Sequence, residues 1–209
     1  MFRSILFAAA ITMALHATAD ITVVYAMMDG NQLRVEYRDA ANFRIGTDSQ
    51  NYQLMLDGRL YAVAQGYLID VDIVSRQIKA FGADTFLASV LGDATADMPT
   101  DISLHPLGWQ ETVAGHTGEV YEMVARTAKG EQRTDLVVTR HPDLVAVQGA
   151  LLKAARETVS AVGAESSVYT RPLKQVEQQH LGGLLRYGKQ LKLLSLDHAP
   201  IPAGRIAMP

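Results

Sequence analysis

The sequence predicts an α+β protein, mainly β, in which a curved antiparallel sheet or half-open β-barrel is covered by one or two helices. Hydrophobic and polar residues alternate over most of residues 21–71, and turn residues interrupt this alternation at short intervals. A long stretch with helical spacing follows only at residues 142–162. The short connections in the first region leave no room for the crossover helices that parallel strands require, so a doubly wound parallel sheet is disfavoured.

The first alternating region contains the clearest strand signal. Leu33, Val35 and Tyr37 fall on one face of a strand, and the intervening Arg34, Glu36 and Arg38 fall on the other. Turns are expected at 29–30 and 57–58, both Asp-Gly pairs, and further strands at 43–45, 52–56 and 60–64. Together these segments predict an antiparallel meander.

The middle of the chain has a mixed pattern. Residues 67–91 carry apolar side chains at spacings that suit one broken helix or two short ones, with Gly82 as the break. Residues 92–108 contain several Gly, Pro and Asp residues, which predict a turn-rich connection. A second hairpin follows, with strands at 119–125 and 133–139. In its first strand Val120 and Val124 face away from Tyr121 and Met123.

The firmest helix prediction covers residues 142–162, where Pro142 suits the first turn and Gly163 the end. A stripe that includes Leu144, Val147 and Leu151 would pack against the sheet. A second short helix is expected at 172–181, a closing hairpin at 184–196 around Gly188, and an extended tail after it. All of residues 20–209 are expected to form one domain.

The first 19 residues have the pattern of a secretory signal peptide. Arg3 precedes an apolar run of about 11 residues, well short of the ~20 that span a bilayer. An Ala-Thr-Ala site then predicts cleavage after Ala19. A buried N-terminal helix is the alternative. The chain has no cysteine, which excludes disulfides, thiolate metal sites and a lipid-modified cysteine. We therefore expect a periplasmic protein that keeps no transmembrane anchor after cleavage.

Composition and motifs disfavour several classes of function. The net charge is −3 and no basic block is present, so nucleic acid is not an expected partner. Nucleophile-elbow, phosphate-loop, zinc-protease and dinucleotide motifs are all absent, and no catalytic residue, metal site or cofactor is predicted. Five histidines outside the leader are scattered singly. Asp70 and Asp72 could ligate calcium or act as an acid/base pair, but solvated aspartates at a helix start explain them as well.

Several short motifs resemble periplasmic carriers of the lipoprotein-localisation (Lol) type and a related bacterial family of unknown function, usually called DUF4412-like. They are LRVEY at residues 33–37, LDGRLY at 56–61, ETVAGH at 111–116 with EVY at 119–121, and APIP at 199–202 with a final MP. Two features depart from the family pattern. Gly118 stands near a position where a cysteine is common, and Arg205-Ile206 replaces an aromatic residue.

The resemblance implies an incomplete antiparallel barrel around a hydrophobic cavity that holds an acyl chain, a lipid or a lipoprotein. Inward-facing side chains would either line this cavity or fill a core. The candidates are Leu33, Val35, Tyr37, Leu54, Leu56, Val120 and Val124. On the opposite face, Arg34, Arg38 and Arg44 could meet a lipid headgroup or an envelope partner, or could simply be solvated.

Three hypotheses of function follow. The first is a non-enzymatic periplasmic protein that binds an apolar ligand or an envelope partner. The second is a packed structural or interaction module of the envelope without a ligand. The third, an envelope hydrolase, would place carboxylates such as Asp70 and Asp72 in a cleft.

Overall fold

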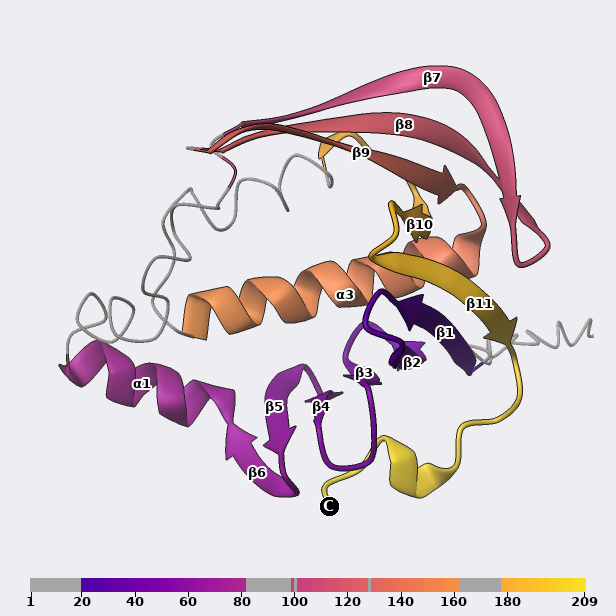
Figure 1. Ribbon diagram of the computed structural model, residues 1–209. Coiled ribbons are helices and arrows are strands. Elements are labelled where there is room, and N and C mark those ends of the chain that lie inside the picture. The colour runs from indigo at the N-terminus through magenta and orange to yellow at the C-terminus, as the bar shows by residue number, and fades with distance from the viewer. Residues whose placement is uncertain (1–19, 82–98, 100, 128, 162–177) are drawn as a thin grey trace, which may run out of the picture.

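The computed structural model describes residues 20–81, 99, 101–127, 129–161 and 178–209. Within them, eleven strands form one antiparallel sheet in the order β6-β5-β4-β3-β2-β1-β11-β10-β9-β8-β7. The sheet is open, with β6 and β7 at its edges, and it curves around the long helix α3 (Figure 1). The predicted fold class, mainly β with a half-open curved sheet and covering helices, is confirmed.

The first six strands follow one another in the chain and in space. They are β1 Ile21–Met27, β2 Gln32–Asp39, β3 Asn42–Gly46, β4 Tyr52–Leu56, β5 Arg59–Ala64 and β6 Tyr67–Asp70. The expected strands at 43–45, 52–56 and 60–64 are confirmed, as is the turn at Gly30, whose φ of 86° suits glycine. Pairing of β1 with β11 joins this meander to the second half of the sheet.

The second half contains a long hairpin and a short closing one. Its strands are β7 Asp101–Val113, β8 His116–Thr127, β9 Gly130–Thr139, β10 Gly183–Tyr187 and β11 Leu191–Asp197. The two helices described are α1 Val71–Phe81 and α3 Pro142–Ala161, and a 3₁₀ turn, η2, covers Ala203–Arg205. Both predicted hairpins are confirmed.

Residues 67–70 correct one expectation. They form strand β6 and not the start of a helix, because they pair with β5 across the turn at Gly66. Asp70 then ends the strand and caps the helix. Its Oδ1 accepts the backbone N–H groups of Asp72 at 3.0 Å and Ile73 at 3.3 Å. Helix α1 therefore begins at Val71, and the expected continuation to residue 91 lies outside the described residues.

Strand β7 corrects a second expectation. Residues 101–108 belong to a 13-residue strand and not to a turn-rich connection. Pro106 is tolerated because β7 is an edge strand, where a missing N–H leaves no partner unsatisfied. The register with β8 shifts between Pro106 and Gln110, which accommodates Gly108 at a φ of 75°. The turn residues therefore mark an irregular edge strand.

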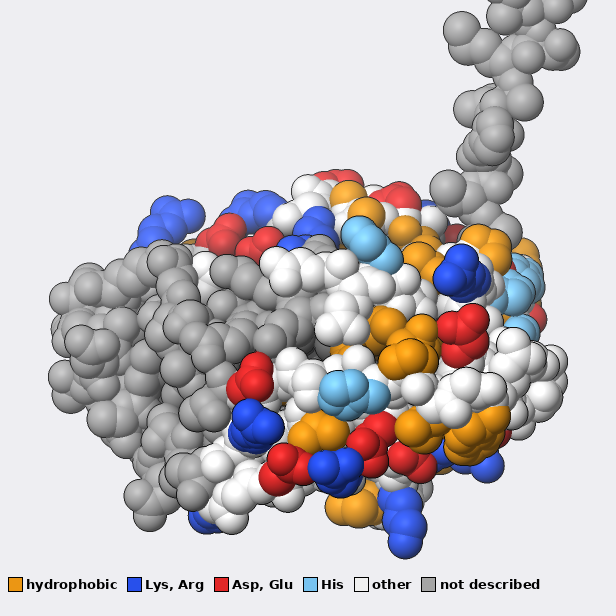
Figure 2. Space-filling model, turned by 90° about the horizontal axis from the view of Figure 1, so that it is seen from above, with side chains coloured by type: hydrophobic (Ala, Val, Ile, Leu, Met, Phe, Trp, Pro, Cys, Tyr) orange, Lys and Arg blue, Asp and Glu red, His pale blue; other side chains and the backbone are white. Residues whose placement is uncertain are grey.

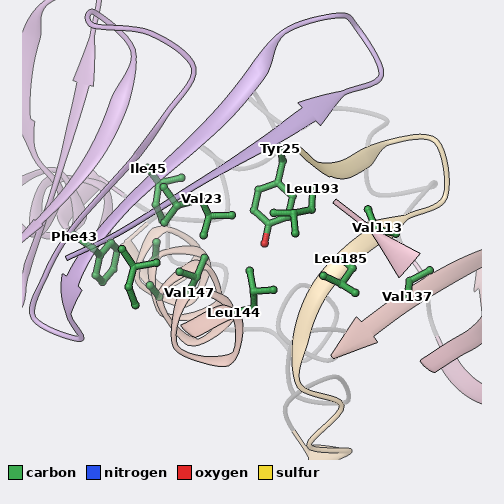
Figure 3. Close-up of a cluster of buried hydrophobic side chains, with 14 of the residues drawn as sticks. Val23, Tyr25, Phe43, Ile45, Val113, Val137, Leu144, Val147, Leu185 and Leu193 are labelled. Atoms are coloured by element: carbon green, nitrogen blue, oxygen red, sulfur yellow. The ribbon is translucent and has the colours of Figure 1, made fainter. Parts of the chain in front are cut away.

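The main core lies between α3 and the inner face of β1–β3 (Figure 3). It continues into the second half of the sheet through Val113, Val120, Val137, Leu185 and Leu193. Val23, Val35 and Phe43 from the sheet and Leu144 and Val147 from the helix are fully buried in it. The predicted stripe is thus confirmed for the first half of α3. Further along the helix, Ala150 and Ala154 are the buried residues.

Helix α3 can approach the sheet closely because β10 begins with a glycine. A Cβ at Gly183 would overlap the backbone and side chain of Leu144. On the outer face, the C-terminal tail crosses the sheet and buries Ile201 and Ile206 against Leu54 and Tyr61. The expected short helix at 172–181 lies mostly outside the described residues.

Candidate functional site

A cavity of about 510 Å³ lies between the inner face of β7–β10 and one flank of α3. The sheet side of its wall is the cluster of Ile102, Met123, Ala125 and Leu136, all of which are buried. Leu152 of α3 lies on the opposite side of the cavity, and Leu181 contributes from the segment before β10. A volume of this size is typical of small-molecule sites.

The described lining of this cavity contains no charged side chain. Besides the residues just named it consists of Pro99, Thr127, Gln132, Thr134, Val138, Gln148, Gly182, Leu184, Tyr187 and Gln190. Burial raises the pKa of Tyr187, so this phenol is neutral at physiological pH. A neutral, largely apolar lining suits hydrocarbon and would penalise a buried charge.

Among the polar residues of this lining, Gln148 has an unsatisfied atom. Its Oε1 atom is buried and has no hydrogen-bond partner among the described residues. A buried acceptor without a partner costs about 1–3 kcal/mol of desolvation. The side chain of Gln148 thus lines the cavity while its oxygen remains an unsatisfied buried acceptor.

A second hollow, polar and also about 510 Å³, continues along the same face. Along β8, Glu119 and Tyr121 line the polar hollow, and Met123 and Ala125, next on the same face, line the apolar cavity. Val138 and Leu181 line both. The concave face therefore changes from polar to apolar along one strand.

Histidines gather at the polar hollow, although they are scattered in the sequence. The rings of His116 and His141 meet edge to face at 5.1 Å, and His180 lines the same hollow. Close by, Asp143 Oδ2 lies 2.7 Å from His198 Nε2 and 3.8 Å from His141 Nδ1. Within the described part of the chain, however, no three His, Asp or Glu side chains are arranged to hold a metal ion.

The seven residues predicted to line a cavity lie elsewhere. Leu33, Val35, Tyr37 and Val120 belong to the main core, and Leu54 and Leu56 to the cluster under the C-terminal tail. Val124 is buried on β8, next in sequence to the lining residues Met123 and Ala125. None of the seven is part of the described wall of the apolar cavity.

The three predicted headgroup arginines separate into two environments on the outer face. Arg38 donates from Nε to Asp20 at 3.1 Å and from Nη2 to the carbonyl oxygen of Ile201 at 3.5 Å, which ties the start of the sheet to the tail. Arg34 and Arg44 instead lie together around the buried Glu36.

Asp70 and Asp72, the carboxylates of the hydrolase hypothesis, lie at the start of α1 and beside Arg59. Asp70 caps α1 and also accepts from Arg59 Nη2 at 2.9 Å, and Asp72 lies 3.9 Å from Arg59 Nε. Ser103 Oγ and His105 Nε2 lie 3.1 Å apart, within hydrogen-bond distance. Both lie on β7 and line neither the apolar cavity nor the polar hollow.

The surface above the cavity has a mixed character. Figure 2 looks down on the molecule from above the view of Figure 1. In the described part of this surface, hydrophobic, acidic, basic and histidine side chains lie among one another. Trp109 of β7 is 48% exposed. Within the described residues, no helix has both the length and the apolar character needed to cross a membrane.

Sequence reasoning missed the residues that line the cavity. Met123 and Tyr121 were assigned to the face opposite Val120, and this assignment is confirmed by their separate cores. The available signal was that β8 is apolar on both faces, as expected for a strand covered on both sides. Comparison with protein-family models, with curated proteins and with solved structures yields no match for this chain.

Proposed function

We propose that this chain is a non-enzymatic protein that binds a ligand with an apolar chain between β7–β10 and α3. The observation that carries the proposal is the cavity of about 510 Å³, whose described lining is uncharged. An acyl chain of a lipid or lipoprotein matches such a lining, because it buries apolar surface and brings no charge into the interior.

The polar hollow supports an amphipathic ligand. With the chain beside Met123 and Ala125, the polar end would lie near Tyr121, Arg140 and His180. A carrier of this kind needs no cofactor and no catalytic residue.

The expected location is the periplasm. This rests on the leader pattern of residues 1–19, which the described residues do not include. The sheet begins at Ile21, so removal of residues 1–19 leaves every described strand complete. Fractionation of cells, with N-terminal sequencing of the recovered protein, tests this part of the proposal. The expected N-terminus is Asp20.

Titration with a fluorescent fatty acid tests the ligand directly. Protein stripped of lipid is expected to bind one equivalent with a fluorescence increase. Ala125→Phe, which fills the cavity from a buried wall position, should abolish this signal. Ala64→Phe places the same side chain at an exposed position of β5 and should leave binding intact. Equal binding by both variants would rule out this cavity as the site.

A second candidate function, an envelope interaction module, has its own observation. The edge strand β6 exposes three consecutive apolar residues, Tyr67, Leu68 and Ile69, and Tyr67 is 75% exposed. An unpaired edge can accept an extended segment of another protein as an added strand. In-cell crosslinking from position 67 should then capture a stoichiometric partner, and Leu68→Lys should weaken this capture. A protein that carries lipid but yields no crosslink at this edge would exclude this candidate.

A further inference from the structure

The outer face of the sheet contains a small pocket of about 170 Å³, on the side opposite the apolar cavity. Arg34 and Glu36 of β2, Arg44 of β3 and Arg205 of the C-terminal tail line it, together with the turn at residues 46–49. The tail thus adds a third arginine to two that neighbouring strands supply.

Glu36 lies at the centre of this group. Its side chain is only 3% exposed. Arg34 Nε donates to its Oε1 at 3.1 Å, and Arg205 Nε donates to Oε1 at 2.9 Å and to Oε2 at 3.1 Å. The terminal Nη groups, which carry most of the N–H donors of a guanidinium, take no part in these bonds. Arg34 and Arg205 therefore present donors beyond those that hold Glu36.

Arg44 is held in place from several sides. It stacks on the ring of Tyr52 at 3.7 Å, and its Nη2 donates to the carbonyl oxygen of Asp48 at 3.2 Å. Its Nη1 lies 3.8 Å from Glu36, which is too long for a strong hydrogen bond. Burial lowers the pKa of Arg44, and repulsion from Arg205 adds to this effect.

The charges in the pocket are not balanced. Three guanidinium groups face the carboxylates of Glu36 and Asp48, and Asp48 is occupied in its own turn, where it accepts the backbone N–H groups of Gln50 and Asn51. The lining therefore has a net positive charge, and part of it is buried. A bound anion would relieve the repulsion among the arginines.

We propose that this pocket is a phosphate-binding site formed by Arg34, Arg44 and Arg205. Guanidinium groups that converge from two strands and the tail suit the several oxygens of a phosphate, and each can offer a paired donor geometry. The phosphate belongs either to a free phosphate ester or to a lipid headgroup. The inference is independent of the apolar cavity, because it uses the other face of the sheet.

Isothermal titration with inorganic phosphate at low ionic strength tests the site. We expect saturable binding that weakens with added salt. Arg34→Gln and Arg205→Gln should each weaken it by about tenfold or more, because each removes a charged donor. The matched control is Arg133→Gln, which removes the same charge from β9, where Arg133 pairs with Glu122 and Glu131. This control should bind phosphate like the unaltered protein.

Vesicle flotation identifies the source of the phosphate. Arg34-dependent flotation with phosphatidylglycerol vesicles, but not with phosphatidylcholine vesicles, supports a lipid headgroup. Titratable phosphate binding without flotation supports a free phosphate ester. Arg34→Lys serves as the variant that keeps the charge and the fold, since Arg34 is half exposed. The proposal is overturned if neither assay detects binding, or if Arg133→Gln weakens binding as much as Arg34→Gln.

Discussion

The two halves of the sheet use the same helix in different ways. Against β1–β3 and the start of β10, α3 packs Leu144, Val147 and Ala154 into a closed core. Against β7–β10, the other flank of the helix, with Gln148 and Leu152, faces a cavity. One face of the sheet is therefore filled at one end and hollow at the other. The meander and the helix thus form the packed part of the molecule, and the ligand site proposed above lies in the hollow part.

The largest expected difference between the halves comes from two leucines of α3. Leu144→Ala removes a fully buried side chain from the closed core and should lower the free energy of unfolding by about 2–5 kcal/mol. Leu152→Ala makes the same change at a half-buried position beside the cavity, and should cost less than about half as much. Urea unfolding of both variants measures this. Equal losses would contradict a hollow second half.

Larger side chains should also destabilise the packed half more than the hollow half. Ala154→Phe inserts a ring into the packed side of α3 and should cost about 1–3 kcal/mol or more. Ala125→Phe inserts it at the cavity wall, where space exists, and should change stability by less than about 1 kcal/mol. Thermal unfolding compares the two. A larger loss for Ala125→Phe would show that the cavity is filled.

Two glutamines, Gln53 of β4 and Gln148 of α3, sharpen the comparison further. In the packed half, Gln53 Nε2 donates to Thr158 Oγ1 at 3.1 Å, so Gln53→Leu should cost about 1 kcal/mol. In the hollow half, Gln148 Oε1 has no partner among the described residues, so Gln148→Leu should stabilise the ligand-free protein by about 1 kcal/mol. Chemical denaturation should therefore show changes of opposite sign in the free energy of unfolding of the two variants. A loss of stability in Gln148→Leu would indicate that this oxygen already has a partner.

The smallest effect concerns the contact that joins both ends of the described chain to the packed half. Asp20 Oδ2 accepts the Ile201 N–H at 2.7 Å. Desolvation opposes ionisation of Asp20, but its hydrogen bonds to Arg38 and Ile201 outweigh this and lower its pKa. The contact therefore stabilises the fold above about pH 4, the ordinary value, and is lost as the pH falls through the lower pKa of the folded state.

An NMR titration of the Ile201 amide measures this loss. Its chemical shift is expected to change with a midpoint below the ordinary aspartate value, and the change should be absent in Asp20→Asn. A midpoint at or above that value would contradict the account of this contact.

Much of the fold follows from local pattern, and the site does not. The alternation at Arg34, Val35 and Glu36 identified the two faces of β2, because a covered strand must place its apolar side chains on one side. Pro106 and Gly108 were mistaken for a connection, since at a sheet edge they cost a strand little. Whether an inward face is packed or hollow depends on how closely a helix approaches it.

The outer pocket that we propose binds phosphate shows the same limit of local sequence patterns. Arg34 and Arg44 were visible, together with Arg38, as a cationic group on one face of the meander. Arg205 lies 161 positions or more away along the chain, yet bonds to Glu36 at 2.9 Å. Only the path of the tail over the sheet, fixed by Ile201 and Ile206, brings it there.

Mass spectrometry of lipid extracted from the protein, recovered from its native envelope without detergent, tests the central claim most directly. The account predicts one acyl-chain lipid for each molecule of the unaltered protein and of Ala64→Phe, and none for Ala125→Phe. An unaltered protein that carries no lipid, and that binds no fatty acid after extraction, would contradict it.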